Sequence, residues 1–525
     1  MSRLRVVRAF ETPGIPALGL LALLCAPLSV NPQSHRATSA LPAAYPVTVK
    51  INGGVEYQKL AGFGQASPGT LWHPGTQTLS DSLRAKAVEK AYGEVRLNLG
   101  RLGTVLESPG SYDQRQNDDN DPFHTNWSGF NTEALDQARR YVVDLAKPFG
   151  FSGYFLGGES PNVRWGSPWL ASIRNQDYSR FLDEVAEHVL ADLTYWKNTY
   201  GEELPLYQLG NEQLSGNRAL INPDLTGFGS VNPTQQMVDV TVRAGTRIRA
   251  AGFLRTRFIV GAEETERNSL KLATAILNDS RASQYVGVIG YHTYPYMQGY
   301  SSISFILGTS GAGRPDSNRI AVRNDIRDLA SKHKVEVWMT ENSNAGDSTS
   351  YDDFRARTIQ IHDEFGYANA AAYFAMGPMW DLITQREHFH NNNFLASEGT
   401  AVLINNTTGT VDIAGIGHAI GHYARWIKPG AIRVDAISSD PQIQVTAFHD
   451  KALHRIGMVL INNAGSPVTV NGSLSGLALS SGLDGEQSTP AAYWKPLAPI
   501  PRKTSSVFQI RLPPISVTSL AGPAE

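Results

Sequence analysis

Short apolar runs alternate with longer amphipathic stretches between about residues 60 and 375. The eight apolar runs predict strands at 60–64, 95–99, 154–156, 206–209, 258–260, 286–291, 335–339 and 370–375. The amphipathic stretches predict helices, among them 81–92, 132–147, 178–200 and 234–251. Strands that alternate with helices indicate a parallel sheet, and about eight such units fit a closed (β/α)8 TIM barrel. An open doubly wound sheet is the alternative, although Gly62-Phe-Gly64 lacks the rest of a phosphate-binding fingerprint.

The pattern changes after about Pro429, where short strands follow one another without helices between them. Gly, Ser, Asn and Pro turns separate these runs, which include 432–436, 443–447, 456–461 and 507–512. This texture predicts a C-terminal β-sandwich side domain, which an N-terminal strand at 47–51 joins. We therefore predict a catalytic barrel over 60–425 and a side domain made of 45–59 plus 426–525.

The N-terminus has the layout of a secretory signal peptide over residues 1–40. Arg3, Arg5 and Arg8 precede an apolar run over 15–30, and small residues follow at Ser39-Ala40. An N-terminal membrane anchor is the alternative, although the run is short for a span. The only cysteine, Cys25, lies inside this segment, so the mature chain is predicted to lack disulfides. We expect a secreted, periplasmic or extracellular protein with no membrane span after signal removal.

The charge of the chain narrows its partners. A net charge of −2 gives no basic surface for nucleic acid or for an anionic membrane. Metal-binding patterns fail as well, because His388-Phe-His390 lacks helical spacing and further ligands. We predict no metal and no cofactor, and the sequence carries no signal of oligomeric state.

Carboxylates at predicted strand ends are the strongest candidates for chemistry, because barrel sites form where strands end. Glu212 follows the fourth predicted strand, and Glu341 follows the seventh. Cleavage of a glycosidic bond needs two carboxyl groups, one to protonate the leaving oxygen and one to attack the anomeric carbon or activate water. These two strands lie roughly across the barrel, so their carboxylates could face each other over a bound sugar. The rival carboxylates at other strand ends are Glu107, Glu159, Glu263 and Glu264.

Several segments together resemble the retaining (β/α)8 glycosidases, and in particular glycoside hydrolase family 30. They are Ala61-Gly-Phe-Gly64, the loop over 158–169, Asn211-Glu212, Gly290-Tyr-His-Thr-Tyr294, Trp338-Met-Thr-Glu341 and Gly421-His-Tyr-Ala-Arg-Trp-Ile-Lys-Pro-Gly430. In that family a segment like the last one ends the barrel and enters the side β-sandwich. The resemblance implies a carbohydrate substrate, which for family members is a xylan, a β-1,6-linked glucan or galactan, an aryl or alkyl β-glycoside, or a glucosylceramide-like lipid.

The resemblance also implies roles for single residues. Glu212 would be the acid/base and Glu341 the nucleophile, with Asn211 bonded to the sugar 2-hydroxyl. Arg101 would hold Glu341 ionised through charge-assisted hydrogen bonds. His292 and Tyr294 would line the glycone pocket, and Trp380 would form its floor.

Each assignment has a plainer alternative. Glu212 is alternatively an ordinary loop or capping carboxylate, and Arg101 alternatively neutralises Glu107. His292 and Trp380 are alternatively packed core residues. The chain departs from the family at Gln213, where proline is usual, and this leaves the substrate class open. The alternative functions are another retaining barrel glycosidase and a carbohydrate-binding barrel without catalysis.

Overall fold

Eight parallel strands close into a barrel in the computed structural model. In barrel order they are β2 (Gly62–Ala66), β3 (Leu99–Arg101), β4 (Gly153–Gly157), β5 (Leu206–Gln208), β6 (Arg257–Val260), β7 (Val286–His292), β8 (Glu336–Glu341) and β9 (Ala372–Ala375). The structure describes residues 46–66, 79–102, 118–157, 168–214, 232–293, 317–342, 349–376, 400–405 and 407–525. The predicted closed barrel is confirmed, and the open doubly wound sheet is excluded.

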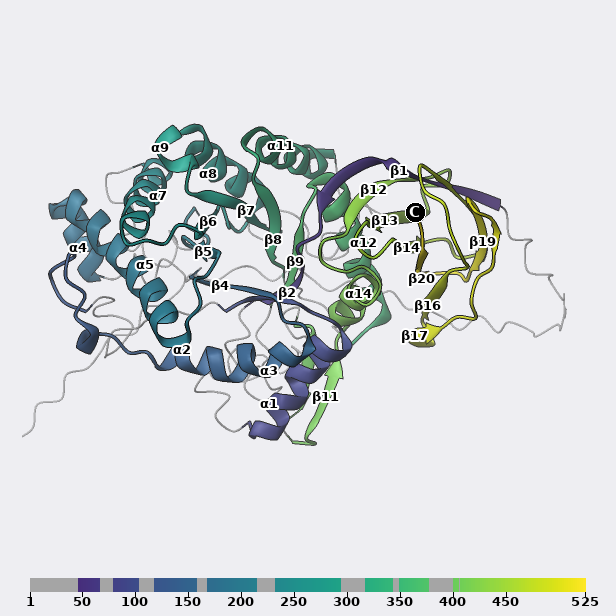
Figure 1. Ribbon diagram of the computed structural model, residues 1–525, viewed down its shortest axis with the longest axis horizontal. Helices are drawn as coiled ribbons and strands as arrows, with labels where there is room; N and C mark the ends of the chain where they lie inside the picture. The colour runs from purple at the N-terminus through teal and green to yellow at the C-terminus, as the bar shows by residue number, and fades with distance from the viewer. Residues whose placement is uncertain are drawn as a thin grey trace, which may run out of the picture. The chain divides into compact units, whose positions relative to one another are not determined.

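Helices flank the barrel strands, as α8 does beside β6 and β7, and α11 beside β7 and β8 (Figure 1). The α-helices are α1 (Asp81–Val88), α2 (Glu133–Ala138), α3 (Asp144–Ala146), α4 (Pro168–Gln176), α5 (Tyr178–Tyr200), α7 (Pro233–Ala250), α8 (Glu266–Asn278), α9 (Ser280–Ser283), α11 (Ser317–His333), α12 (Tyr351–Tyr367) and α14 (Gly415–Ala424). Helix α5 has the predicted bounds because Asp177 caps its first turn and Gly201 ends it in a left-handed conformation. Within the described ranges, none of these helices combines the length and the apolar character that a membrane crossing requires.

Aromatic side chains fill the inside of the barrel. The rings of Phe155, Trp338 and Phe374 contact one another, with centroids 5.8–6.1 Å apart. Gly64 lies against this group, and a Cβ at its position would come within 2.2 Å of the Phe374 ring. The barrel is therefore a packed core rather than a pore, and its chemistry has to lie at the strand ends.

Two predicted elements differ in the structure. The second strand was predicted over 95–99 but begins at Leu99, because the helical turn η3 (Glu89–Glu94) continues until the Val95 N–H bonds the Lys90 carbonyl. The predicted helix over 132–147 is interrupted by the wider turn η5 (Arg139–Val143) and finishes in the 3₁₀ turn η6 (Lys147–Phe149). Another short 3₁₀ turn, η4 (Trp127–Gly129), precedes it.

The C-terminal strands form a ten-stranded sheet that includes the N-terminal strand. In order across the sheet they are β17 (Ala492–Pro496), β16 (Asp484–Thr489), β20 (Ser516–Pro523), β14 (Arg455–Asn462), β13 (Ile443–Asp450), β12 (Ile432–Ser438), β1 (Pro46–Lys59), β15 (Val468–Ser475), β19 (Val507–Leu512) and β18 (Arg502–Thr504). The sheet is continuous, and one apolar cluster draws buried side chains from β1, β13, β14, β15 and β19. Figure 1 shows β1 beside β12, although about 380 residues separate them in the chain. The predicted recruitment of an N-terminal strand is confirmed.

A short hairpin and helix α14 follow the last barrel strand in the chain. The hairpin consists of β10 (Val402–Asn405) and β11 (Thr410–Ile413) and was not predicted. After α14, the backbone of Leu60 bonds both Gly430 and Ala431 before β12 begins. This pairing places the link between β1 and β2 beside the link between α14 and β12.

Two histidines of α14 contact side chains of the C-terminal sheet. The His422 ring is fully buried, and its two nitrogens lie 2.7 Å from the hydroxyls of Ser488 and Ser519. The His418 ring stacks on Tyr493 with 3.8 Å between ring centroids. Burial, together with the nearby charges of Arg425 and Lys90, lowers the pKa of His418 to about 4. Burial likewise lowers the pKa of His422 well below its ordinary value.

We expect the folded chain to lose stability as the pH falls from about 6.5 toward about 4. Over this window the unfolded histidines bind protons that the folded ones exclude, so acid favours unfolding. A tenfold change in proton affinity corresponds to about 1.4 kcal/mol. Urea unfolding at about pH 7 and about pH 5 should show a smaller pH effect in His418→Gln than in the parent chain. An unchanged pH effect would show that folding does not shift the pKa of His418.

Candidate active site

Polar side chains from four barrel strands meet at one end of the barrel. In a parallel barrel all strands end at the same face, so residues far apart in sequence converge there. The residues that meet are Arg101 at the end of β3, Asn211 and Glu212 just after β5, His292 at the end of β7 and Glu341 at the end of β8. All five were predicted as site residues, and the structure brings them into contact.

A bulge in β8 sets the position of Glu341. Tyr291 of β7 pairs with Met339, but the next residue, His292, pairs with Glu341. Thr340 is therefore the extra residue of β8. Bulges bend a strand and redirect the side chains that follow, and they are common beside active sites. Here the bulge brings Glu341, rather than Thr340, to the side of His292.

The guanidinium of Arg101 joins the two halves of the site. One of its amino groups donates to Oε2 of Glu341, and the other donates to Oδ1 of Asn211 over 2.8 Å. The side chains of Arg101 and Glu341 are only 3% and 9% exposed, so water screens their attraction little. Hydrogen bonds between charged partners are the strong ones, and this pair holds the Glu341 carboxylate in one orientation beside a positive charge. This is the contact that the family resemblance implies for Arg101.

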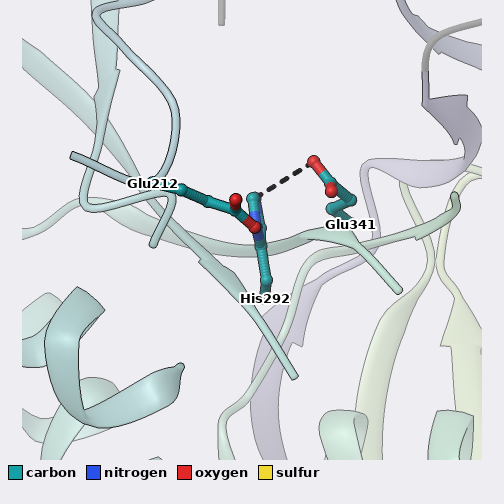
Figure 2. A group of neighbouring side chains, drawn as sticks. All are labelled: Glu212, His292 and Glu341. Atoms are coloured by element: carbon teal, nitrogen blue, oxygen red, sulfur yellow. Dashed lines mark hydrogen bonds and ion pairs between the residues drawn. The ribbon is translucent and has the colours of Figure 1, made fainter. Parts of the chain in front are cut away.

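His292 lies between the two carboxylates. Its Nδ1 is 3.1 Å from Oε1 of Glu212, and its Nε2 is 3.6 Å from Oε2 of Glu341. Figure 2 shows the three side chains together, with the imidazole reaching toward both glutamates. An oxygen of Glu212 lies within 4.8 Å of an oxygen of Glu341. Glu212 is the more accessible of the two, at 17% exposure.

The backbone around Glu212 has an unusual conformation. Glu212 has a φ of 53°, in the left-handed region that non-glycine residues seldom adopt, and Gly210 has a φ of 124°. The Glu212 N–H donates to the Ala262 carbonyl over 2.8 Å, beyond the end of β6. Backbone strain of this kind persists only where surrounding contacts hold it, and it is concentrated at functional sites.

The other predicted residues have different outcomes. Tyr294, Trp380 and the rival carboxylates Glu107 and Glu159 lie outside the described residues. Glu263 is described, and its two oxygens accept backbone N–H groups of Gln213 and Leu214. A carboxylate committed to two backbone donors is a poor candidate for the proton donor.

Sequence reasoning missed Gln208 as a part of the site. Its amide donates to the Gly210 carbonyl over 2.9 Å and lies 3.4 Å from Oδ1 of Asn211. Gln208 is 1% exposed, and it is the polar residue that ends the otherwise apolar run of β5. Its type and position were therefore a usable signal, because a buried polar side chain needs a hydrogen-bonding partner.

Glu212, His292 and Glu341 are also of the residue types that bind metals, and their potential ligand atoms lie within 4.8 Å of one another. Two features fit a cation poorly. The Arg101 guanidinium already bonds Oε2 of Glu341 and brings a positive charge. The nitrogens of His292 face different carboxylates instead of sharing one point with them. The donor set is better suited to proton transfer between carboxylates and a bound molecule.

Solved structures share the fold of this chain. An endoxylanase of glycoside hydrolase family 30 from Clostridium papyrosolvens C71 is 19% identical, with a TM-score of 0.61 over 91% of this chain and 100% of that one. The catalytic domain of the family 30 xylanase C from Talaromyces cellulolyticus is 16% identical, with a TM-score of 0.62 over 90% and 99% of the two chains. A family 44 xyloglucanase from Paenibacillus polymyxa is 14% identical, with a TM-score of 0.56 over 91% and 100%.

This chain thus has the barrel and side-sheet fold of the family 30 glycoside hydrolases. No known family model matches the sequence, and no curated protein does. The fold is shared with a family 44 enzyme as well. Because one fold hosts different functions, the activity has to be argued from the site.

Proposed function

We propose that this protein is an exported retaining β-glycoside hydrolase in which Glu341 is the nucleophile and Glu212 the acid/base. The separation of the two carboxylates carries the proposal. Retaining glycosidases hold the pair about 5–5.5 Å apart, whereas inverting enzymes leave roughly 6.5–9.5 Å for a water molecule. The distance of at most 4.8 Å between a Glu212 oxygen and a Glu341 oxygen fits direct attack by a carboxylate.

The surroundings of the two glutamates favour this division of roles. Glu341 receives the Arg101 guanidinium, which stabilises an anion and orients it for attack. Glu212 is more exposed, as suits a group that exchanges protons with a leaving group and with water. Since Oδ1 of Asn211 accepts from Arg101, its amide nitrogen is the group that would donate to a sugar hydroxyl.

The reaction follows in two displacements. An oxygen of Glu341 forms a bond to the anomeric carbon while the glycosidic bond breaks, and the departing oxygen takes its electron pair and the proton of Glu212. Glu212 then removes a proton from water, whose oxygen bonds the anomeric carbon and expels Glu341. Two inversions restore the starting configuration, and both glutamates return to their initial states.

A substrate panel tests the proposal. The chain lacking residues 1–40 should release product from at least one of the aryl β-glucosides, xylosides, galactosides and glucuronides, or from xylan or β-1,6-glucan. The first product should be the β-anomer by NMR, a chelator should leave the rate unchanged, and Glu341→Gln should be inactive. N-terminal sequencing of the exported protein would fix the signal boundary. Retention of a sugar without product would instead support a carbohydrate-binding barrel.

A further inference from the structure

Glu263 is a buried acid that connects three strand ends of the site. It follows β6, and its residue is only 1% exposed. Oε1 accepts the Gln213 N–H over 2.8 Å, and Oε2 accepts the Leu214 N–H over 2.7 Å. Its backbone carbonyl accepts the His292 N–H over 3.1 Å. One residue therefore holds both the segment that follows Glu212 and the end of the strand that carries His292.

The segment held by Glu263 directly follows a sharp turn of the backbone. Gly210 and Glu212 both have positive φ, so the chain turns sharply on either side of Asn211. A Cβ at position 210 would come within 2.6 Å of Gln213 Nε2, so the Gln213 side chain packs directly against this turn. The bonds from Ala262 and Glu263 are the described contacts that tie residues 212–214 to the neighbouring strand end. The Glu263 carboxylate accepts hydrogen bonds from the backbone N–H groups of both Gln213 and Leu214.

Glu263 is itself fixed in place from the helix side. The Ser269 hydroxyl of α8 lies 3.2 Å from the Glu263 N–H and 3.3 Å from the Glu263 carbonyl. Ser269 is fully buried. Because Ser269 fixes the backbone of Glu263, the Glu263 carboxylate can in turn fix the position of the backbone that it binds. This position matters, since misplacement of a catalytic group by about 1 Å can cost roughly 100-fold in rate.

We infer that Glu263 is a positioning residue for proton transfer, which holds Glu212 where it can protonate the leaving group. The inference rests on the proposed glycosidase function and adds a residue to it. Glu263 acts through the backbone of residues 212–214 and needs no contact with the substrate. Its loss should therefore impair the step that needs the proton of Glu212, and spare substrates that leave without one.

The test compares two leaving groups on whichever sugar the enzyme accepts. A phenyl glycoside needs protonation to depart, whereas a 2,4-dinitrophenyl glycoside does not. We expect Glu263→Ala to lower kcat/KM for the phenyl substrate roughly 100-fold and for the dinitrophenyl substrate by less than about threefold. Glu263→Gln keeps one acceptor but turns an NH₂ group toward the other N–H, so its loss should be intermediate.

Two controls separate positioning from plain structural support. Glu486→Gln changes another buried carboxylate, which lies in the C-terminal sheet and forms a 3.1 Å ion pair with Arg425. This variant should lower stability without a leaving-group effect. A double-mutant cycle is sharper. In a Glu212→Ala background, adding Glu263→Ala should change kcat/KM by no more than about twofold, because the group being positioned is already absent.

The outcomes are distinct. An equal loss on both leaving groups, or a further large loss in the Glu212→Ala background, would overturn the positioning role while leaving the glycosidase intact. A parent enzyme without activity on any substrate, by contrast, would overturn the proposed function and this role with it.

Discussion

Glu341→Ala is expected to lower kcat on the order of 10⁴- to 10⁶-fold, the loss typical when the nucleophile of covalent catalysis is removed. Alanine cannot form the bond to the anomeric carbon, and Glu212, which serves the leaving group on the other side of the sugar, cannot replace the lost nucleophile. Turnover of an aryl β-glycoside, measured at saturating substrate, gives the comparison with the parent enzyme.

Azide distinguishes a lost nucleophile from a damaged site. The truncation leaves room beside the Arg101 guanidinium, whose charge attracts a small anion. Azide should attack the anomeric carbon once, so activity returns and the product is the inverted α-glycosyl azide. An active Glu341→Ala enzyme in the absence of azide would contradict the assignment.

The folded state of this variant needs its own control. Removing one member of a buried charge pair costs about 3–5 kcal/mol, because the other charge stays buried without its partner. Glu341→Ala leaves the buried Arg101 charge without this carboxylate, whereas Glu341→Gln keeps the side-chain volume and one hydrogen-bond acceptor. Circular dichroism and the melting temperature of both variants should be measured beside the kinetics. Loss of activity in a folded Glu341→Gln enzyme supports chemistry rather than unfolding.

The barrel was predictable because its strands are short, buried runs bounded by helical periodicity. All eight predicted runs overlap a barrel strand, and Tyr178–Tyr200 was predicted to the residue. Capping supplied that accuracy, since Asp177 and Gly201 are strong local signals. Around Val95 the signal failed. Val95 and Leu97 are apolar and buried, as strand residues are, yet they close a helical turn against the outer core.

The site was predictable only in part, for a physical reason. Strand-end position and residue type gave Glu212 and Glu341 among several rival glutamates, since convergence at one face follows from a parallel barrel. The family resemblance selected these two. The bulge at Thr340 and the left-handed Glu212 depend on neighbouring strands, and neither leaves a local pattern in the sequence. Glu263 had the same sequence features as a catalytic carboxylate. Only the structure distinguishes an acid that bonds the backbone from one that faces another carboxylate.

Glu212→Ala is expected to have the second large effect, and its size should depend on the leaving group. General acid catalysis contributes about 10²- to 10⁴-fold, so a phenyl glycoside should lose roughly that much in kcat/KM. A 2,4-dinitrophenyl glycoside departs without a proton, and Glu341 is still present to attack it. Its kcat/KM should change little, but the glycosyl-enzyme then accumulates because no base activates water. A burst of dinitrophenolate followed by slow turnover would record this.

Azide should accelerate that slow turnover, since it is a nucleophile that needs no base. The product should be the β-glycosyl azide, with the starting configuration kept because the sugar is inverted twice, first by Glu341 and then by azide. The pair of variants thus gives opposite anomers from one reagent, and only a double displacement with these two roles has that consequence. An α-azide from Glu212→Ala, or equal losses on both leaving groups, would mean that the roles of the two glutamates had been assigned wrongly.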